Sequence, residues 1–211
     1  MPPSTPTVFL VDDEPGMRKA LSRLLGAEGF KVRAFPSAKA FLDSYREDES
    51  GCLVLDIAMP DLDGLELQER LSHSGILLPI VFLTGRGDIP MTVQAIKAGA
   101  VDFLTKPVND EALLNAVRAA LQRAEEQHER IAEAAHLRQR HGRLTPREAE
   151  VMRYVVAGHL NKQIAAELGT GEQTIKVHRA RVMKKMGVES LADLVRAGER
   201  LGLSRPVIRD P

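Results

Sequence analysis

Short apolar runs alternate with longer amphipathic segments through the first half of this 211-residue chain. Uninterrupted apolar runs of this length are typical of strands that are buried on both faces of a parallel sheet. The segments between them repeat apolar residues three and four positions apart, as helices do. We therefore expect five strand–helix units that form a small doubly wound α/β domain. The expected strands lie at residues 8–11, 31–35, 52–55, 80–83 and 102–105.

Most of these apolar runs lead directly into a reactive polar side chain. Asp12 and Asp13 follow the first run, Asp56 ends the third, Thr84 ends the fourth and Lys106 follows the fifth. The carboxyl ends of parallel strands meet at one edge of the sheet, where ligands bind in open α/β folds, so these side chains should gather there. Three carboxylates, an ammonium and a hydroxyl indicate a metal-dependent phosphoryl site. An acidic helix start or a solvated lysine would explain any one of these positions. It would not explain why reactive side chains follow one expected strand after another.

The second half of the chain has the pattern of four short helices. Thr145, Pro146 and Glu148 combine an N-cap, a proline at the first helical position and a capping-box acid. Asn161 can cap a second helix that ends at Gly169, a third is expected over residues 172–186, and a fourth after residue 190. Two short helices joined by a tight glycine turn, the second of them basic, are typical of a helix-turn-helix.

Residues 108–140, between the two halves, contain no proline or glycine and repeat apolar or small residues at helical spacing. This pattern predicts one long helix, whose first half is apolar enough to pack on the α/β domain. Along the helical seam of its second half, Ile131 is accompanied only by small or polar residues, so a dimer-forming signalling helix and a solvated spacer both fit. We expect domains at residues 1–122 and 142–211, joined by a helical linker at 123–141.

The net charge of zero conceals an uneven distribution. Residues 1–110 carry 11 basic and 16 acidic side chains, residues 111–141 carry 5 of each, and residues 142–211 carry 13 and 8. An acidic and a basic domain suit different partners, although random surface scatter also gives differences of this size. Cys52 lies inside a strand-like run and fits an inert buried thiol in a reducing compartment. Without a leader or a membrane-length apolar stretch, we expect a soluble cytoplasmic protein with no membrane contact.

The expected helix over residues 172–186 has one buried side and one polar side. A helical wheel places Ile175, Val182 and Met186 on the buried side. The polar side suits the major groove and backbone of double-stranded DNA, while Arg179, near the buried edge, is expected in an intramolecular salt bridge or on a flanking phosphate. We expect the DNA contacts to be Gln173, Thr174, Lys176, Val177, Arg181 and Lys184, with Asn161 and Lys162 from the preceding helix.

The motifs around the strand ends resemble the receiver domain of bacterial two-component response regulators, over about residues 6–122. They are Asp12-Asp13, LDIAMPDLDG at 55–64, Thr84-Gly85 and DFLTKP at 102–107. The resemblance implies that Asp56 accepts a phosphoryl group from a sensor histidine kinase. It also implies that Mg²⁺ is held directly by Asp13 and Asp56, through water by Asp12, and by the carbonyl of Ala58.

The same resemblance implies a switch. Thr84 and Phe103 would be the switch pair, with Phe103 standing where many members have tyrosine, and Lys106 would sense the phosphate. It further implies a cis peptide bond before Pro107. A proline that simply ends the strand has the same sequence, so the sequence alone does not separate the two cases. A phosphatase of the haloacid dehalogenase type would need a second acid at the position of Ala58, so that alternative fits less well.

The basic half resembles the LuxR-type DNA-binding domain over residues 142–205. The motifs are LTPRE at 144–148, NKQIA at 161–165 and TIKVHR at 174–179, while Gly171 replaces a usual N-cap serine and Ala180 a base-reading lysine of some relatives. The two resemblances together imply a FixJ-type transcriptional regulator that binds promoter DNA and catalyses only its own phosphorylation and dephosphorylation. Phosphorylation would promote a homodimer through a helix around residues 91–97 and the following strand, with RNA polymerase as a further candidate partner.

Overall fold

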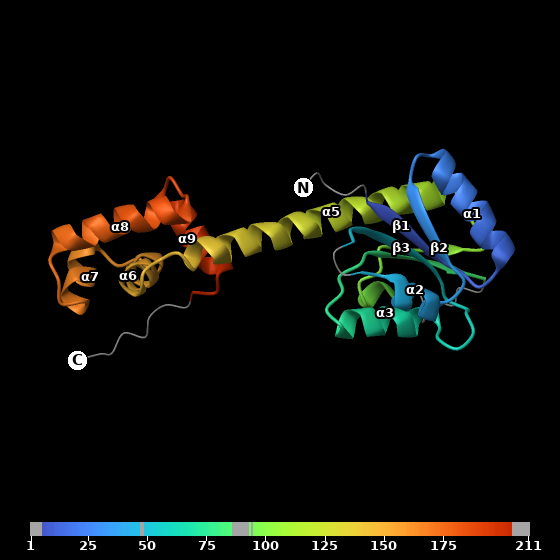
Figure 1. Cartoon of the computed structure of the whole chain (residues 1–211), viewed down its shortest axis with the longest axis horizontal. Coiled ribbons are helices and arrows are strands. Elements are labelled where there is room, and N and C mark those ends of the chain that lie inside the picture. The colour runs from blue at the N-terminus through green and yellow to red at the C-terminus, as the bar shows by residue number, and fades with distance from the viewer. Residues whose placement is uncertain (1–5, 47–48, 86–92, 94, 204–211) are drawn as a thin grey trace. The chain divides into compact units, whose positions relative to one another are not determined.

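Two compact units, Met1–Glu129 and Arg130–Pro211, make up this computed structural model, which describes residues 6–46, 49–85, 93 and 95–203 (Figure 1). The division falls inside helix α5, Asp110–His141, which confirms the predicted long helix. Among the described residues, no helix is both long enough and apolar enough to cross a membrane.

The first unit contains a five-stranded parallel sheet in the order β2-β1-β3-β4-β5. Its strands are β1 Thr7–Val11, β2 Lys31–Phe35, β3 Gly51–Asp56, β4 Ile80–Thr84 and β5 Asp102–Thr105. Since β3 crosses to the far side of β1 from β2, the sheet is doubly wound, as the apolar runs predicted.

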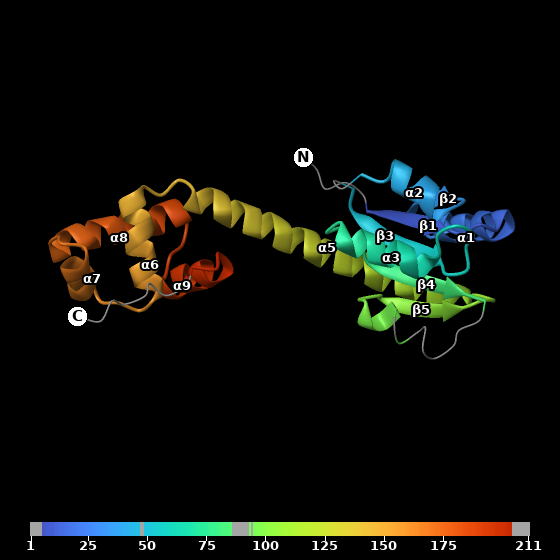
Figure 2. The same ribbon diagram turned by 90° about the horizontal axis from the view of Figure 1, so that it is seen from below.

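Helices cover both faces of this sheet. Helix α1, Pro15–Ala27, and the first half of α5 lie on one face, and α2, Ala38–Ser44, and α3, Gly64–His73, lie on the other (Figures 1 and 2). Strand β1 supplies both cores because successive side chains point to opposite faces. Phe9 belongs to the core under α2 and α3, whereas Leu10 belongs to the core under α1 and α5.

A side-chain cap on α2 and the predicted burial of Cys52 are seen in this unit. The Ser37 hydroxyl caps α2 by accepting a hydrogen bond of 3.2 Å from the Ala40 N–H. Cys52 is fully buried in β3, and this burial raises the pKa of its thiol to about 12, so the thiol stays protonated and inert.

The helix expected between β4 and β5 is only partly described. Residues 86–92 and 94 lie outside the described residues, while Val93 and residues 95–97 are helical and a turn at Gly99 follows. The face that the sequence suggested for dimerisation, around residues 91–97, therefore lies partly outside the described residues.

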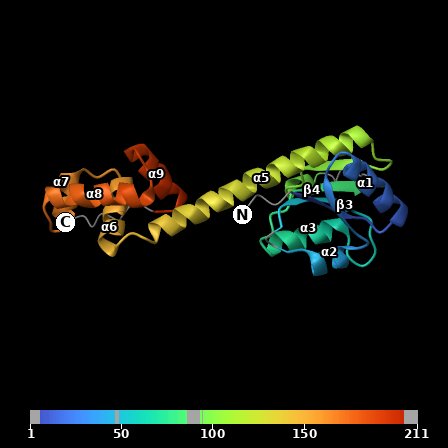
Figure 3. The ribbon, with the colours of Figure 1, turned by 45° about the horizontal axis from the view of Figure 1, so that its top comes forward.

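In the described part of the second unit, four short helices follow the end of α5 (Figure 3). They are α6 Pro146–Val156, α7 Asn161–Glu167, α8 Glu172–Met186 and α9 Leu191–Arg200. Thr145 caps α6 as predicted, Ser190 caps α9, and Gly187 closes α8 with a left-handed φ of 65°. Their apolar faces meet in one core around Met152, Ile164 and Val182.

One predicted cap is wrong. Helix α7 has its N-cap at Leu160, and Asn161 is its first helical residue. The Gln163 carboxamide instead reaches back and accepts a hydrogen bond of 2.8 Å from the Leu160 N–H, so this end of α7 is satisfied without Asn161.

Candidate functional site

Three carboxylates meet at the carboxyl edge of the sheet. Strands β1 and β3 are neighbours with Val11 opposite Leu55, and this register places Asp12 beside Asp56 at the ends of the two strands. One oxygen each of Asp12, Asp13 and Asp56 lie within 4.8 Å of one another. Asp12 and Asp56 are buried, with exposed fractions of 0% and 3%, whereas Asp13 is more exposed. The structure thus brings together the predicted acidic residues.

Lys106 bridges two of these carboxylates. Its Nζ donates to Asp12 Oδ2 at 2.9 Å and to Asp56 Oδ2 at 2.8 Å, and the more exposed Glu14 carboxylate lies 3.6 Å away. Partial burial of the ammonium acts to lower the pKa of Lys106, but the hydrogen bonds and charges of Asp56 and Asp12 outweigh it and raise the pKa above its ordinary value. Lys106 therefore stays charged, and its contacts offset part of the cost of burying the two carboxylates.

Backbone groups hold the remaining oxygens of the site. Asp12 Oδ1 accepts from the Glu14 N–H at 2.8 Å, and Asp56 Oδ1 accepts from the Ala58 N–H at 3.3 Å. The Arg18 guanidinium donates to the Asp12 carbonyl at 2.6 Å. In each buried carboxylate, one oxygen thus accepts a hydrogen bond from a backbone N–H and the other accepts one from Lys106. The two bonds fix the orientation of the carboxylate.

Gly64, the first residue of α3, makes a close approach that the sequence did not reveal. A Cβ at this position would lie 2.5 Å from the carbonyl oxygen of Asp56. The chain leaves β3, turns, and returns at the start of α3 to pack its backbone against the backbone of the site. Only the missing side chain of Gly64 allows that approach.

Thr84 and Phe103 lie on the neighbouring strands of the same edge. Thr84 ends β4 and is buried, and the backbone of β5 pairs with β4 along its whole length. The half-buried Phe103 ring lies 6.3 Å from the Phe82 ring, centroid to centroid, and packs against the core under α2 and α3. The peptide bond between Lys106 and Pro107 is cis, as the family resemblance implied.

The donor set of this edge suits a divalent metal ion. Asp12, Asp13 and Asp56 converge, and Lys106 pairs with only two of them, which leaves an excess of negative charge. Their oxygens are the hard ligands that Mg²⁺ prefers. The predicted fourth protein ligand, Ala58, follows β3 closely and is exposed at the same edge. The residues present therefore fit the ion.

In the second unit, α8 presents the polar face that the helical wheel predicted. Ile175, Val182 and Met186 are buried, which confirms the inward side. The outward residues Gln173, Thr174, Lys176, Val177, Ala180, Arg181 and Lys184 are exposed. The wheel correctly identified the side of α8 that is open to a partner.

Arg179 makes an intramolecular contact, as predicted, but with a different kind of group. Its guanidinium donates to the amide oxygen of Asn161 at 2.6 Å, not to a carboxylate, and this bond ties α8 to α7. Lys162, the next residue of α7, is exposed beside this contact.

A buried ion pair that the sequence did not predict joins α6 to α8. Glu148 is 3% exposed, and its Oε2 accepts from Lys185 Nζ at 2.5 Å and from the Thr145 N–H at 2.8 Å. The hydrogen bonds from Lys185 and Thr145 lower the pKa of Glu148 to about 2. One carboxylate thus caps α6 and anchors the second half of α8.

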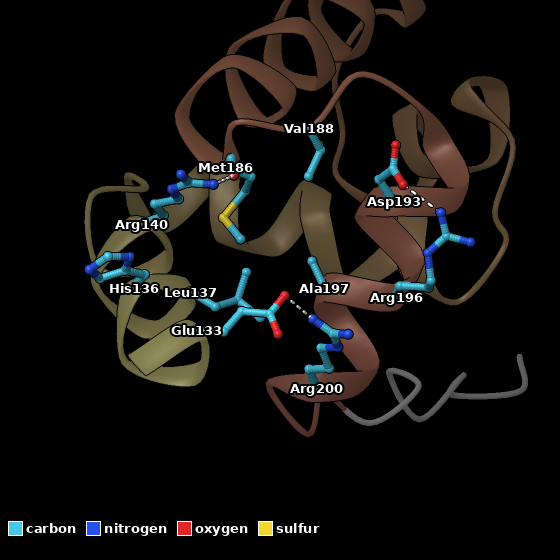
Figure 4. Close-up of a pocket in the computed structure, with 10 residues that line it drawn as sticks. All are labelled: Glu133, His136, Leu137, Arg140, Met186, Val188, Asp193, Arg196, Ala197 and Arg200. Carbon is cyan, nitrogen blue, oxygen red and sulfur yellow. Dashed lines mark hydrogen bonds and ion pairs between the residues drawn. The ribbon is translucent and has the colours of Figure 1, made fainter. Parts of the chain in front are cut away.

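The last turns of α5 contact the ends of α8 and α9 around a pocket of about 470 Å³ (Figure 4). Arg140 donates to the Met186 carbonyl at 3.1 Å, and Glu133 pairs with Arg200. Arg196 pairs with Asp193 on α9 itself. Each of the three arginines around this pocket already has a partner. These contacts stabilise the unit, and they leave the pocket with little net charge to offer a ligand.

Comparison with known proteins places both units in families. Residues 8–118 match the response regulator receiver domain, and residues 142–197 match the luxR family of bacterial regulatory proteins. The chain is 49% identical to Nodulation protein W of Bradyrhizobium diazoefficiens over 93% of its own length and 87% of that protein. It is 42% identical to the transcriptional regulatory protein FixJ of the same organism, over 93% and 96%.

Solved structures show the same relationship. The response regulator StyR is 47% identical, with a TM-score of 0.82 over 93% of this chain and 100% of that one. Full-length FixJ from B. japonicum is 41% identical, with a TM-score of 0.57 over 95% and 99%.

Proposed function

Because the chain belongs to the FixJ-type response regulators of two-component systems, we propose that the carboxylate of Asp56 is the phosphoryl acceptor of this DNA-binding transcription regulator. Regulators of this family are controlled by phosphorylation from a sensor histidine kinase. The observation that carries the proposal is the position of Asp56. It ends β3 beside two further carboxylates, and its Oδ2 is held 2.8 Å from the Lys106 ammonium.

The transfer would form one bond and break another. A carboxylate oxygen of Asp56 attacks the phosphorus of a phosphohistidine on the kinase and forms a P–O bond. The P–N bond breaks, and its electron pair stays on the freed ring nitrogen, which takes up a proton from solvent. Lys106 then turns from the Asp56 carboxylate to a phosphoryl oxygen, and the Thr84 hydroxyl donates to another. Burial of Asp56 limits access of water to the acyl phosphate.

We infer that Asp12, Asp13, Asp56 and the carbonyl of Ala58 would hold Mg²⁺, which receiver domains typically bind. The ion would supply positive charge that neutralises the donor phosphoryl group and the acidic cluster. The excess of carboxylates over ammonium groups at this edge supports the inference, because a dianionic donor would otherwise meet a negatively charged site.

Acetyl phosphate with Mg²⁺ tests the acceptor directly, because it replaces the kinase. We expect intact-mass measurement to show one added phosphoryl group on the wild type and none on Asp56→Asn. The matched control is Asp61→Asn, an exposed acid on the same turn whose positive φ of 68° asparagine also adopts. It should gain the same mass as the wild type, and an equal gain on Asp56→Asn would refute the assignment.

The DNA contacts follow from the exposed face of α8. We propose that Gln173, Thr174, Lys176 and Val177 enter the major groove and that Arg181, Lys184, Asn161 and Lys162 contact its edges and backbone. What supports this division is the order of the residues along α8. Gln173, Thr174, Lys176 and Val177 lie in its N-terminal half, the end that reads bases in a helix-turn-helix, and Arg181 and Lys184 lie in its C-terminal half.

Phosphorylation would act through the neighbouring strands. We propose that it draws Thr84 toward the phosphate, repacks Phe103 and favours a homodimer through the face around residues 91–97 and β5, with two recognition helices on a two-half-site promoter. Light scattering of the full chain with and without acetyl phosphate measures this, and an unchanged mass would contradict it.

The remaining elements of the proposal concern the whole chain. RNA polymerase is a further partner of the promoter-bound dimer, and the receiver catalyses only its own phosphorylation and dephosphorylation. We keep the domain limits 1–122 and 142–211 with a linker at 123–141. Since promoter DNA lies in the bacterial cytoplasm, we place the protein there.

A further inference from the structure

A second, strongly basic pocket lies between the start of α6 and the second half of α8. Its volume is about 640 Å³. The residues that line it are Arg143, Thr145, Glu148, Arg181, Lys184 and Lys185. Four of these six side chains are cationic, and the single acid is already engaged by one of them.

The charges of this pocket are largely uncompensated. Glu148 binds Lys185, so that pair contributes little net charge. In the part of the chain that the structure describes, no carboxylate pairs with Arg143, Arg181 or Lys184. This distinguishes the pocket from the one beneath α9, whose arginines all have partners (Figure 4). Three free cations around one hollow are suited to an anion.

The position of the pocket on α8 indicates which anion it would meet. Val177, Arg181 and Lys184 are spaced four and three residues apart and therefore lie in one stripe along the exposed face. Helix α8 has 15 residues and is about 22 Å long, whereas the major groove is about 12 Å wide. When Val177 lies in the groove, Lys184, about 10 Å further along the axis, must lie near the sugar–phosphate backbone at its edge.

We propose that this pocket binds a backbone phosphate of double-stranded DNA and that Arg143 is a DNA contact of this protein. Arg143 lies between α5 and α6, outside the helix-turn-helix, and its planar guanidinium can give a phosphate two parallel hydrogen bonds. Lys184 and Arg181 approach the same phosphate from α8. The Glu148–Lys185 pair holds the two walls together and so keeps the three cations apart at a fixed spacing.

The effect of losing Arg143 can be stated in advance. Each neutralised phosphate contributes about −0.9 to the slope of log K against log salt concentration. Arg143→Gln should therefore reduce that slope by about one and weaken binding about fivefold near 0.15 M salt. The loss should be equal on every sequence, because a phosphate carries no base identity.

The test uses the full chain and a short mixed-sequence duplex, titrated over a range of salt concentrations. The control is Arg138→Gln, which removes the same charge from an exposed arginine of α5 in the same unit but outside the pocket. Arg143→Gln should flatten the salt dependence, whereas Arg138→Gln should follow the wild type. Equal slopes for Arg143→Gln and wild type, or equal losses in both variants, would overturn the proposal.

A second measurement separates phosphate binding from base reading. DNA sequences selected by Arg143→Gln should match those selected by the wild type, whereas Val177→Ala should relax the preference at one position. A changed preference in Arg143→Gln would also overturn the proposal. The inference rests on the DNA-binding function but not on phosphorylation of Asp56, because non-specific binding is measured without a phosphoryl donor.

Discussion

Replacement of Glu148 by glutamine should destabilise the second unit at neutral pH, by at most about 3 kcal/mol. The pKa of Glu148 falls from an ordinary value of 4.5 to about 2 in the folded chain. At 1.36 kcal/mol per pKa unit, this difference sets an upper figure of about 3 kcal/mol for the stabilisation from the charge. Glutamine still accepts the hydrogen bond of the Thr145 N–H, so the substitution removes the charge and leaves the cap. Lys185 is 35% exposed, and solvent will reduce the effect somewhat.

The pH dependence of this stabilisation has a defined sign. The pKa of Glu148 is lower in the folded than in the unfolded chain, so its contribution is fully present above about pH 4.5. It disappears as the pH falls toward about 2, where the folded carboxylate also takes up its proton. The glutamine variant should lack this part of the acid dependence.

Tyrosine fluorescence can follow this unit alone. The chain has two tyrosines and no tryptophan, so a Tyr45→Phe background leaves Tyr154, half-buried in the second core, as the reporter. Urea unfolding should show the full difference for Glu148→Gln at pH 7 and a clearly smaller one near pH 3, because the folded carboxylate is only partly protonated there. Glu150→Gln is the control, since its exposed pair with Arg147 contributes at most about 0.5 kcal/mol. A Glu148→Gln midpoint equal to that of the wild type at pH 7 would refute the reasoning.

Two glycine substitutions probe close approaches in the two units. Gly64→Ala should lower the stability of the receiver by about 1–3 kcal/mol and slow phosphorylation of Asp56, because its Cβ would lie 2.5 Å from the Asp56 carbonyl oxygen. Gly16→Ala is the control, since its Cβ would lie in open space, and it should have neither effect. Urea unfolding and acetyl phosphate uptake measure both, and a neutral Gly64→Ala would show that α3 can shift freely. Gly187→Ala should destabilise the second unit by about 1–2 kcal/mol, because φ is 65° and the Cβ would lie 2.8 Å from Arg140 Nη1. An unchanged unfolding midpoint of Tyr154 fluorescence would contradict that.

The elements of this fold were predictable because their signals are local. Apolar runs, helical spacing and caps such as Thr145 each depend on a few neighbouring residues, and all five strands appear where they were expected. The gathering of Asp12, Asp56 and Lys106 was also predictable, because parallel strands bring their carboxyl ends to one edge whatever their order. What the sequence could not supply was the bridge itself, since the reach of Lys106 across the edge to Asp12 depends on the strand order.

Contacts between helices escaped prediction for a related reason. Glu148 and Lys185 are 37 positions apart, and nothing in the periodicity of either helix indicates the angle at which α6 crosses α8. The same holds for Arg143, which joins the basic pocket only because the start of α6 packs beside the end of α8. A wheel can rank the faces of a helix, but the partner on each face depends on packing.

Asn161 illustrates how two local rules compete. An asparagine before a helix is a good cap, so the sequence favoured that role, but the Gln163 side chain satisfies the Leu160 N–H and the helix starts one residue earlier. The amide oxygen of Asn161 is thereby left to accept from Arg179 across the turn. This contact fixes α7 against α8 on the side of α8 away from its exposed stripe. Asn161 and Arg179 therefore orient the recognition helix whether or not either residue touches DNA.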